Sequence, residues 1–396
     1  MTVLIEKHPI RDWLIKVRRD LHKHPELGHE ETRTTGKVKA ILMELGIEIR
    51  EMNGLETGAV GLLGSGNGPV IGLRADMDAL PITQLNDVPY KSTVPGVMHA
   101  CGHDCHTAIM LGVAKSLVET GLAKKLKGRV KFIFQPAEEK MTGARAMIDA
   151  GVLEKPSMDR IIAGHMFIDL PVGQVGFFKR VSHASADTFH LTIHGKSIHG
   201  ARPHMGIDPI IAGSQFLNSI QTIISRNTDP ADQAVISVGS FNAGTAPNII
   251  PDSATLSGTV RTFDENVRKR IVERLSDITL GLEKSMGVKV DFRYIDGVPV
   301  APVDDIVTTD VKRAAESVLG ADNVHYLDTK MGAEDFSFFS RTIPATFMRV
   351  GCGNPDKGIV HLPHSSRFDV DEDALVVGVD VLVETVKRFL VDGTSG

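Results

Sequence analysis

The sequence predicts an α/β protein with a smaller α+β domain inserted into it. In the first half of the chain, short apolar runs bounded by glycine alternate with segments of helical periodicity, as in a mainly parallel sheet flanked by helices. From about residue 182 to 297 the pattern changes to the period-two alternation of half-exposed strands. We therefore expect a larger domain in two parts, 1–181 and 298–396, interrupted by a domain at 182–297.

The elements of the larger domain follow in order along the chain. Apolar residues at helical spacing from Trp13 to about Leu45, interrupted by a His-Pro pair, predict two helices. Later apolar segments predict a helix over 107–122, a helix over 308–319 and a closing helix over 372–391. Buried strands, most of them ending in polar loops, are expected at GAVGLLG, PVIGLRADMDALP, RVKFIFQPAEE, RIIAGHMF and PATFMRVG.

The inserted domain is expected to follow a split β-α-β-β-α-β order. Its helices are predicted at about 208–226 and 265–286. Its strands are predicted at DTFHLTIHG, AVISVGSFNAG, SATLSGTVRT and VKVDFRYID. No internal repeat or long linker separates the two domains, which favours an insertion over two consecutive domains.

Composition excludes several classes of protein. The 396 residues carry a net charge of −5 with Lys and Arg scattered, so no nucleic-acid partner is expected. Glu6 and Lys7 break the apolar N-terminus, and no segment reaches the ~20 apolar residues of a membrane span, so we expect a cytoplasmic protein without a membrane partner. Three cysteines, an odd number, indicate thiols or metal ligands rather than a disulfide framework.

The densest chemical motif is HACGHDCH, from His99 to His106. Six of its eight side chains can bind a metal or transfer a proton, whereas a single buried histidine is usually a hydrogen-bonded core residue. Thiolate and imidazole together suit a borderline-soft ion such as zinc, and Cys101 and His103 can converge on one ion from a loop. Cys105 and His106 begin the following helix, and their direct involvement stays open.

Three further motifs place polar groups near strand ends, where ligands bind in parallel sheets. QPAEE ends in Glu138 and Glu139; one carboxylate can bind a metal while the other acts as a general base, although an isolated Glu pair is usually solvated surface. RADMDALP carries Asp76 and Asp78, one of which can orient a metal-bound histidine. HLPHSSRFD, from 361 to 369, supplies a histidine in a late loop.

These motifs form an ordered set that covers essentially the whole chain and resembles the M20 metallopeptidase superfamily. The likeness is strongest to the amidohydrolase branch that contains hippurate hydrolase, auxin amino-acid conjugate hydrolases and N-acetyldiaminopimelate deacetylase. The resemblance implies a zinc-peptidase-like α/β catalytic domain with an inserted lid and dimerisation domain. The set comprises RRDLHKHPELGHEE, LRADMDALPI, MHACGHDCHTA, FQPAEE, GHM, GKSIHGARPHMGIDPI, APNIIP, MGAEDFSFF and HLPHSSRFDVDEDAL.

The resemblance implies a centre of two divalent ions, zinc first, with manganese, cobalt or nickel as alternatives. The implied ligands are Cys101, His103, Glu139, His165 and His364. Glu138 takes the place of the general base, and Asp78 that of the residue orienting a ligand. The wider superfamily has His-x-Asp where this chain has Asp76 and Asp78, so the role of Asp76 is left open.

The activity that the resemblance implies is hydrolysis of N-acyl amino acids to a carboxylic acid and a free amino acid. Asn248 and Arg261 match positions that bind the substrate carboxylate, and His199 matches a histidine that stabilises an oxyanion in the neighbouring subunit of a homodimer. His204 is then only a neighbour, and Cys352 is structural or incidental. A true dipeptidase or carboxypeptidase stays open, as does a metal-binding or sensor protein without turnover, which would not need Glu138. Thiol redox chemistry fails because Cys101 and Cys105 are not in C-x-x-C spacing.

Overall fold

The structure, a computed structural model, describes residues 7–393, which divide into two compact units. The first unit contains the described residues up to Ser182, together with Pro302–Thr329 and the described residues from Phe338 onward. The second contains His183–Ala301 and also Lys330–Ser337, a short segment that the sequence analysis assigned to the larger domain.

The first unit is built on an eight-stranded mixed sheet with the order β1-β2-β4-β3-β5-β16-β6-β15. The central strands β4, β3, β5 and β16 pair in parallel, whereas β1, β2 and β6 introduce antiparallel pairs nearer the edges. The strands are β1 (Glu48–Arg50), β2 (Ala59–Gly64), β3 (Val70–Asp76), β4 (Arg129–Gln135), β5 (Arg160–Pro171), β6 (Val175–Phe177), β15 (Val324–Tyr326) and β16 (Ala345–Gly353).

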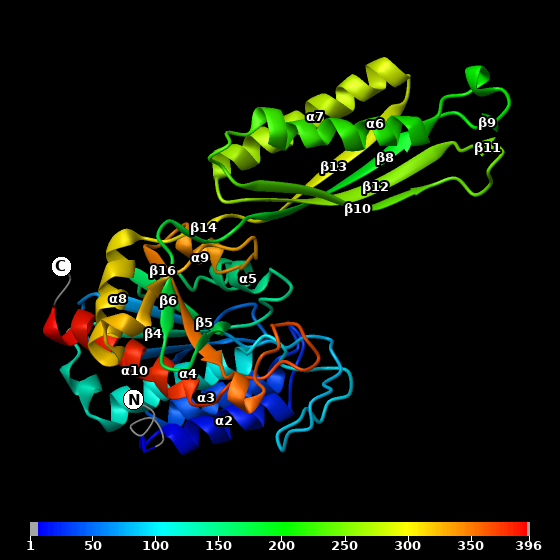
Figure 1. Ribbon diagram of the computed structural model, residues 1–396. Helices are drawn as coiled ribbons and strands as arrows, with labels where there is room; N and C mark the ends of the chain where they lie inside the picture. Colours follow the sequence, from blue (N-terminus) through cyan, green and yellow to red (C-terminus); the bar gives the residue numbers. More distant parts are fainter. Residues whose placement is uncertain (1–6, 394–396) are drawn as a thin grey trace. The chain divides into compact units, whose positions relative to one another are not determined.

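Apolar faces of the helices build the core of this unit against the sheet. In Figure 1, α2, α4 and α10 lie side by side, and their buried residues join those of the central strands in one cluster. Every residue of β3 is buried, as expected of a central parallel strand covered on both faces. The helices are α2 (Arg11–Lys23), α3 (Thr32–Glu44), α4 (His103–Glu119), α5 (Gly143–Asp149), α8 (Asp305–Leu319), α9 (Ser337–Ser340) and α10 (Ala374–Lys387).

The second unit is a four-stranded antiparallel sheet, β10-β12-β8-β13, with two helices packed on it. Leu191, Leu256 and Phe216 are buried between the sheet and the helices. The strands β8 and β12 alternate buried and less buried residues along most of their length, which is the period-two pattern that predicted them. Its main elements are β8 (Ala186–His194), α6 (Pro209–Thr222), β10 (Ala234–Ala243), β12 (Ser253–Thr262), α7 (Glu265–Met286) and β13 (Lys289–Val298).

Two small strand pairs complete the structure: β9 (Ile198–His199) pairs with β11 (Ile249–Ile250), and β7 (Val181–His183) pairs with β14 (Ala301–Pro302). The α/β fold class is confirmed. The short strands β1, β6 and β15 were not predicted, since three residues are too few to show a periodicity. Among the described residues, no helix combines the length and the apolar character that crossing a membrane requires.

Candidate functional site

In the first unit, the side chains that can bind a metal or transfer a proton gather where β3, β4 and β5 approach the start of α4. Asp76 is the last residue of β3, and β4 ends at Gln135, three residues before Glu138. A late loop joins them, because the backbone N–H of His364 donates to the carbonyl of Ala100 at 2.8 Å. The fold therefore brings together motifs that are more than 280 residues apart in the sequence.

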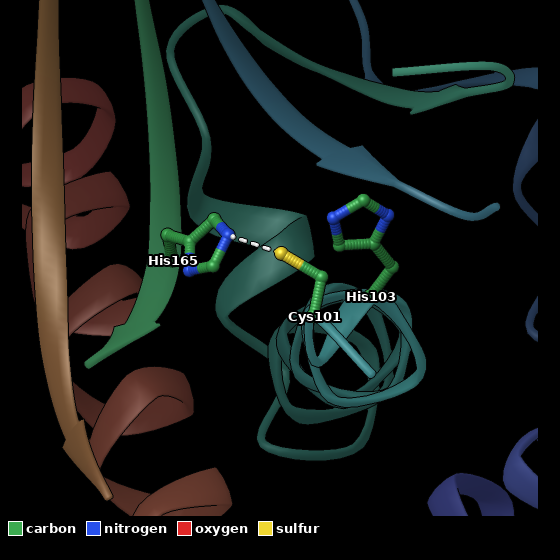
Figure 2. A group of neighbouring side chains, drawn as sticks. All are labelled: Cys101, His103 and His165. Atoms are coloured by element: carbon green, nitrogen blue, oxygen red, sulfur yellow. Dashed lines mark hydrogen bonds between the residues drawn. The ribbon is translucent and has the colours of Figure 1, made fainter. Parts of the chain in front are cut away.

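Cys101 lies between two imidazole rings in this cluster (Figure 2). Its Sγ is 3.3 Å from Nε2 of His165. The other ring nitrogen of His165, Nδ1, lies 2.8 Å from the carbonyl oxygen of Met166, which can only accept a hydrogen bond. Nδ1 therefore carries the proton, and Nε2 presents its lone pair toward the thiol.

His103 also donates a hydrogen bond from Nδ1, but to a carboxylate. Its Nδ1 donates to Oδ1 of Asp78 at 3.1 Å, and its Nε2 is buried without a hydrogen-bond partner among the described residues. The second oxygen of Asp78 accepts the backbone N–H of Glu139 at 3.0 Å. Asp78 thus contacts two of the implied ligand residues at once, which is how a carboxylate behind a metal-binding histidine acts.

The two carboxylates after β4 both lie near His103, and one of them also lies near His364. Oε1 of Glu139 lies 3.3 Å from Nε2 of His364 and 3.8 Å from Nε2 of His103. Oε2 of Glu138 lies 4.0 Å from Nε2 of His103, and Glu138 is buried. The hydrogen bond and charge of Glu139 raise the pKa of His364, whose side chain is 54% exposed. The cluster is therefore buried at Cys101 and His103 and open to solvent at His364.

Buried negative charge dominates the electrostatics of the cluster. Burial alone would lower the pKa of His103, but the carboxylate of Asp76 and the nearby Cys101 outweigh it and raise that pKa well above its usual value. Burial lowers the pKa of His165 well below its ordinary range, so that ring is neutral. Burial also raises the pKa of the Cys101 thiol to about 12. A divalent cation would replace these protons and offset the carboxylates.

The donor set fits a metal centre of the thiolate, imidazole and carboxylate type. Bond lengths of ~2.3 Å to sulfur and ~2.0 Å to nitrogen put the two donors of a tetrahedral zinc about 3.5 Å apart, close to the separation of Cys101 and His165. The orphaned Nε2 of His103 is a second sign of a missing partner. Two groups of mutually close ligand atoms share Cys101: one adds His103 and His165, the other Glu139 and His364.

The local structure corrects two sequence expectations. The helix expected from Thr107 begins at His103, directly after Gly102 with φ 91°, so His103 lies in a helical turn and not in a loop. His165 was expected at a strand end, but β5 continues to Pro171. Pairing with β3 stops at Ala163, two residues before His165.

The other cysteines of the chain take no part in the donor groups. Cys105 and Cys352 are fully buried free thiols, and burial raises the pKa of Cys352 to about 12 and that of Cys105 well above its usual value. Such thiols are inert, as expected for a packing role.

The remaining predicted residues lie in the second unit, and the structure separates them. His199 and Asn248 are exposed neighbours, because the N–H of Gly200 donates to the carbonyl of Asn248 at 2.8 Å. Arg261 lies toward the other end of β12, where its guanidinium donates to the carbonyl of Met331 at 2.7 Å. Eight residues of strand, about 26 Å, separate Ser253 from Arg261. Within one chain, Asn248 therefore precedes the start of β12 and Arg261 lies toward its end.

Sequence reasoning missed the buried charges that support the cluster. Arg18 and His22 of α2 both contact Oδ2 of Asp104, each at 2.8 Å, and all three residues are buried. Oε1 of Glu31 accepts the backbone N–H of Ala137 just before the glutamate pair. A signal existed for two of them: Arg18 and His22, four residues apart, share a helix face with Leu14 and Leu21.

An α/β sheet that gathers thiol, imidazole and carboxylate donors beside a buried glutamate is the architecture of a metal-dependent hydrolase. The sequence matches Peptidase family M20/M25/M40 over residues 72–388, and the chain belongs to this family. It is accordingly a hydrolase of amide bonds.

Relatives of two kinds support this membership. The chain is 39% identical over 373 residues to thermostable carboxypeptidase 2 of Saccharolobus solfataricus, covering 93% of each chain. It is 38% identical over 382 residues to an N-acetylcysteine deacetylase of Bacillus subtilis, covering 94% of this chain and 98% of the relative. A solved Bacillus subtilis structure, described as a dinuclear metal-binding peptidase of the M20 family, matches with a TM-score of 0.84 and 36% identity over 96% of this chain and 98% of that one.

Proposed function

We propose that this chain hydrolyses the amide bond of N-acyl amino acids, releasing a carboxylic acid and a free amino acid. The observation that carries this proposal is the buried carboxylate of Glu138 beside the two donor groups that share Cys101. The proposal draws further support from the relative named as an N-acetylcysteine deacetylase.

Two divalent ions fit the donor groups better than one. The residues that would hold them are Cys101, His103 and His165 in one group and Cys101, Glu139 and His364 in the other. The similar structure described as dinuclear supports this number. Zinc suits the thiolate and imidazole donors, and manganese, cobalt and nickel are alternatives that metal availability would decide.

Glu138 supplies the proton transfer in this proposal. Divalent ions bound here would lower the pKa of the attacking water and polarise the amide carbonyl. Glu138 accepts the proton of that water and then delivers it to the leaving nitrogen, a role that general acid–base catalysis makes worth roughly 10²–10⁴ in rate. Asp78 holds His103 in the tautomer that presents Nε2 and holds the Glu139 backbone beside it.

A carboxypeptidase or dipeptidase activity is the second candidate, and the relative named as a carboxypeptidase favours it. The donor groups serve both reactions equally, because both add water to an amide carbonyl. The two candidates differ only in what lies on the acyl side of the bond.

The experiment that tests the function is a substrate panel with metal control. Purified protein is stripped with a chelator, reconstituted with each divalent ion and given N-acetyl and N-benzoyl amino acids, matched dipeptides, and the N-acyl amino-acid amides. We expect no hydrolysis by metal-free protein, recovery with one or two equivalents of metal, and faster hydrolysis of the N-acyl amino acids than of the dipeptides. Faster dipeptide cleavage would favour the second candidate, and full activity without metal would refute the metal mechanism.

A further inference from the structure

His106 is buried among the implied ligands, yet both of its ring nitrogens are already engaged by the protein. Its ring centroid lies 4.5 Å from that of His165 and 5.4 Å from that of His103. Nδ1 lies 2.5 Å from Oδ1 of Asp76, and Nε2 lies 2.9 Å from the backbone nitrogen of Met166.

The direction of these two hydrogen bonds follows from the backbone. The amide N–H of Met166 can only donate, so Nε2 of His106 is the acceptor. The ring proton is therefore on Nδ1 and is donated to Asp76. A neutral imidazole bonded in this way has no lone pair left for a metal ion, although Asp76, His103 and His106 are close enough to hold one.

The backbone of Met166 is held at both its N–H and its carbonyl group as a result. His106 accepts its N–H, and His165 donates Nδ1–H to its carbonyl oxygen at 2.8 Å. The second contact is the one that orients the His165 ring and turns Nε2 toward Cys101. His106 therefore fixes the backbone against which a proposed ligand is aligned.

Asp76, which accepts the hydrogen bond from His106, also bonds to residues of β3 and β4. Its Oδ2 accepts from the guanidinium of Arg74 at 2.7 Å, and Nε of Arg74 donates to Oε1 of Gln135 at 2.8 Å, three residues before Glu138. Its backbone carbonyl accepts from the hydroxyl of Thr107 at 3.0 Å. All of these side chains are buried. Asp76 thus links the ends of β3 and β4 to the first turn of α4.

We propose that His106 and Asp76 are positioning residues that set the separation of His165 from Cys101 and His103 without binding metal themselves. The inference rests on the metal centre of the proposed function. It assigns Asp76, which stands where the superfamily has a ligand histidine, to a hydrogen-bonded role.

The test measures metal binding in the absence of substrate. Metal-free wild type, His106→Phe, His106→Gln, Asp76→Asn and His165→Ala are titrated with Co²⁺ against a competing chelator while the thiolate and ligand-field absorption bands are recorded. Phe preserves the ring volume and removes both hydrogen bonds, whereas Gln offers one acceptor and one donor. His325→Phe, on β15, is the matched control for loss of a histidine.

We expect His106→Phe to keep the wild-type number of bound ions, to weaken their affinity by roughly 10–100-fold and to shift the cobalt bands. Asp76→Asn should act in the same direction, and His106→Gln should recover part of the affinity. His165→Ala should lose a ligand and with it bound metal, and His325→Phe should match wild type.

Three outcomes would overturn the inference. Loss of one equivalent of metal in His106→Phe would make His106 a ligand. Wild-type affinity and bands in His106→Phe, whatever its thermal stability, would limit the residue to packing. Equal loss in the Gln and Phe variants would contradict the hydrogen-bond mechanism. If wild type itself binds no cobalt, the proposed function fails first, and the two failures are thereby distinguished.

Discussion

At the residue scale, the candidate site is organised by the hydrogen bonds that decide which nitrogen of each histidine is available. The Nδ1–H of His103 donates to Asp78, and the Nδ1–H of His165 donates to the carbonyl of Met166. In both rings Nε2 is left facing the cluster. The sequence contains no direct information about these tautomers, because each partner comes from a different element of the fold.

Glu138→Gln tests the general base. Gln is nearly isosteric, so metal binding and folding should persist while kcat falls by roughly 10²–10⁴-fold, because only the proton transfer is removed. Steady-state kinetics together with metal analysis of the same preparation give the answer.

The matched control for this variant is Glu139→Gln, which removes an implied ligand from the adjacent position. It should lose metal as well as activity. Metal loss in Glu138→Gln with retention in Glu139→Gln would mean that the two glutamates have exchanged roles.

At the scale of elements, the first turn of α4 is the most constrained segment of the site. His103, Asp104 and His106 all lie in this turn, and each contacts a buried partner from another segment of the chain. Asp104 is bound by Arg18, whose pKa is raised well above its usual value because its carboxylate partners outweigh the cost of burial. The turn is therefore held by charge as well as by packing.

Arg18→Met should destabilise the protein by ~3–5 kcal/mol, because it leaves the buried Asp104 without its guanidinium partner and with only His22 beside it. The free energy of unfolding from urea denaturation of metal-free protein measures the effect. Arg19→Met is the matched control, since Arg19 is the next residue, is 42% exposed and pairs with Glu372. It should cost about 1 kcal/mol or less. Equal losses in the two variants would contradict a special role for the buried pair.

The start of α10 provides a pH-dependent contact at the same scale. Burial raises the pKa of Asp371, but hydrogen bonds from Asn354 and Lys357 outweigh it, so the pKa lies below its ordinary value. The folded state therefore favours the charged carboxylate. Its contribution is present above the unfolded pKa of ~3.9 and is lost as the pH falls through the folded value.

Asp371→Asn should accordingly be less stable than wild type at pH 7, by about 1 kcal/mol given that Lys357 is half exposed. The gap should shrink as the pH falls from 4 toward 2. Urea denaturation of both proteins across this range measures the gap, and the exposed Asp322→Asn serves as control. A gap that stays constant or widens in acid would contradict the assignment.

At the scale of the whole molecule, the two units divide the predicted residues between them. The five implied ligands and Glu138 belong to the first unit, and His199, Asn248 and Arg261 belong to the second. His199 and Asn248 lie at one end of the second unit and Arg261 at the other. The resemblance implies that His199 acts on the site of a second copy of the chain, and this stays a prediction.

We propose on this basis a homodimer in which His199 acts in trans, and mixing of inactive chains tests it. His199→Ala and Glu138→Gln chains are combined under conditions that exchange subunits. An oxyanion donor is worth ~3–4 kcal/mol, so its loss should inactivate His199→Ala. A mixed dimer contains one site with both groups intact, so a fraction of wild-type activity should return. Demonstrated exchange without any activity would place His199 within its own chain or outside the reaction.

Much of the fold was predictable because its elements have clear periodicities. Strands β8, β10, β12 and β13 and helices α6 and α7 lie within a few residues of the expected ranges. The boundary of α4 was missed because its first turn carries polar residues that meet buried partners, and such a turn shows no apolar periodicity.

The sequence by itself determined the α/β class and the family, because ordered motifs and apolar periodicity are local properties of the chain. It also nominated the donors that the fold gathers around Cys101, whose chemistry is evident in the residue types. Only the tertiary structure decided that His106 and Asp76 form a hydrogen bond and that Arg18 pairs with Asp104 in the first turn of α4. It also decided that Arg261 lies toward the far end of β12, where it contacts Met331. Hydrogen-bond direction, burial and strand register depend on contacts between segments far apart in the chain, and no local pattern encodes them.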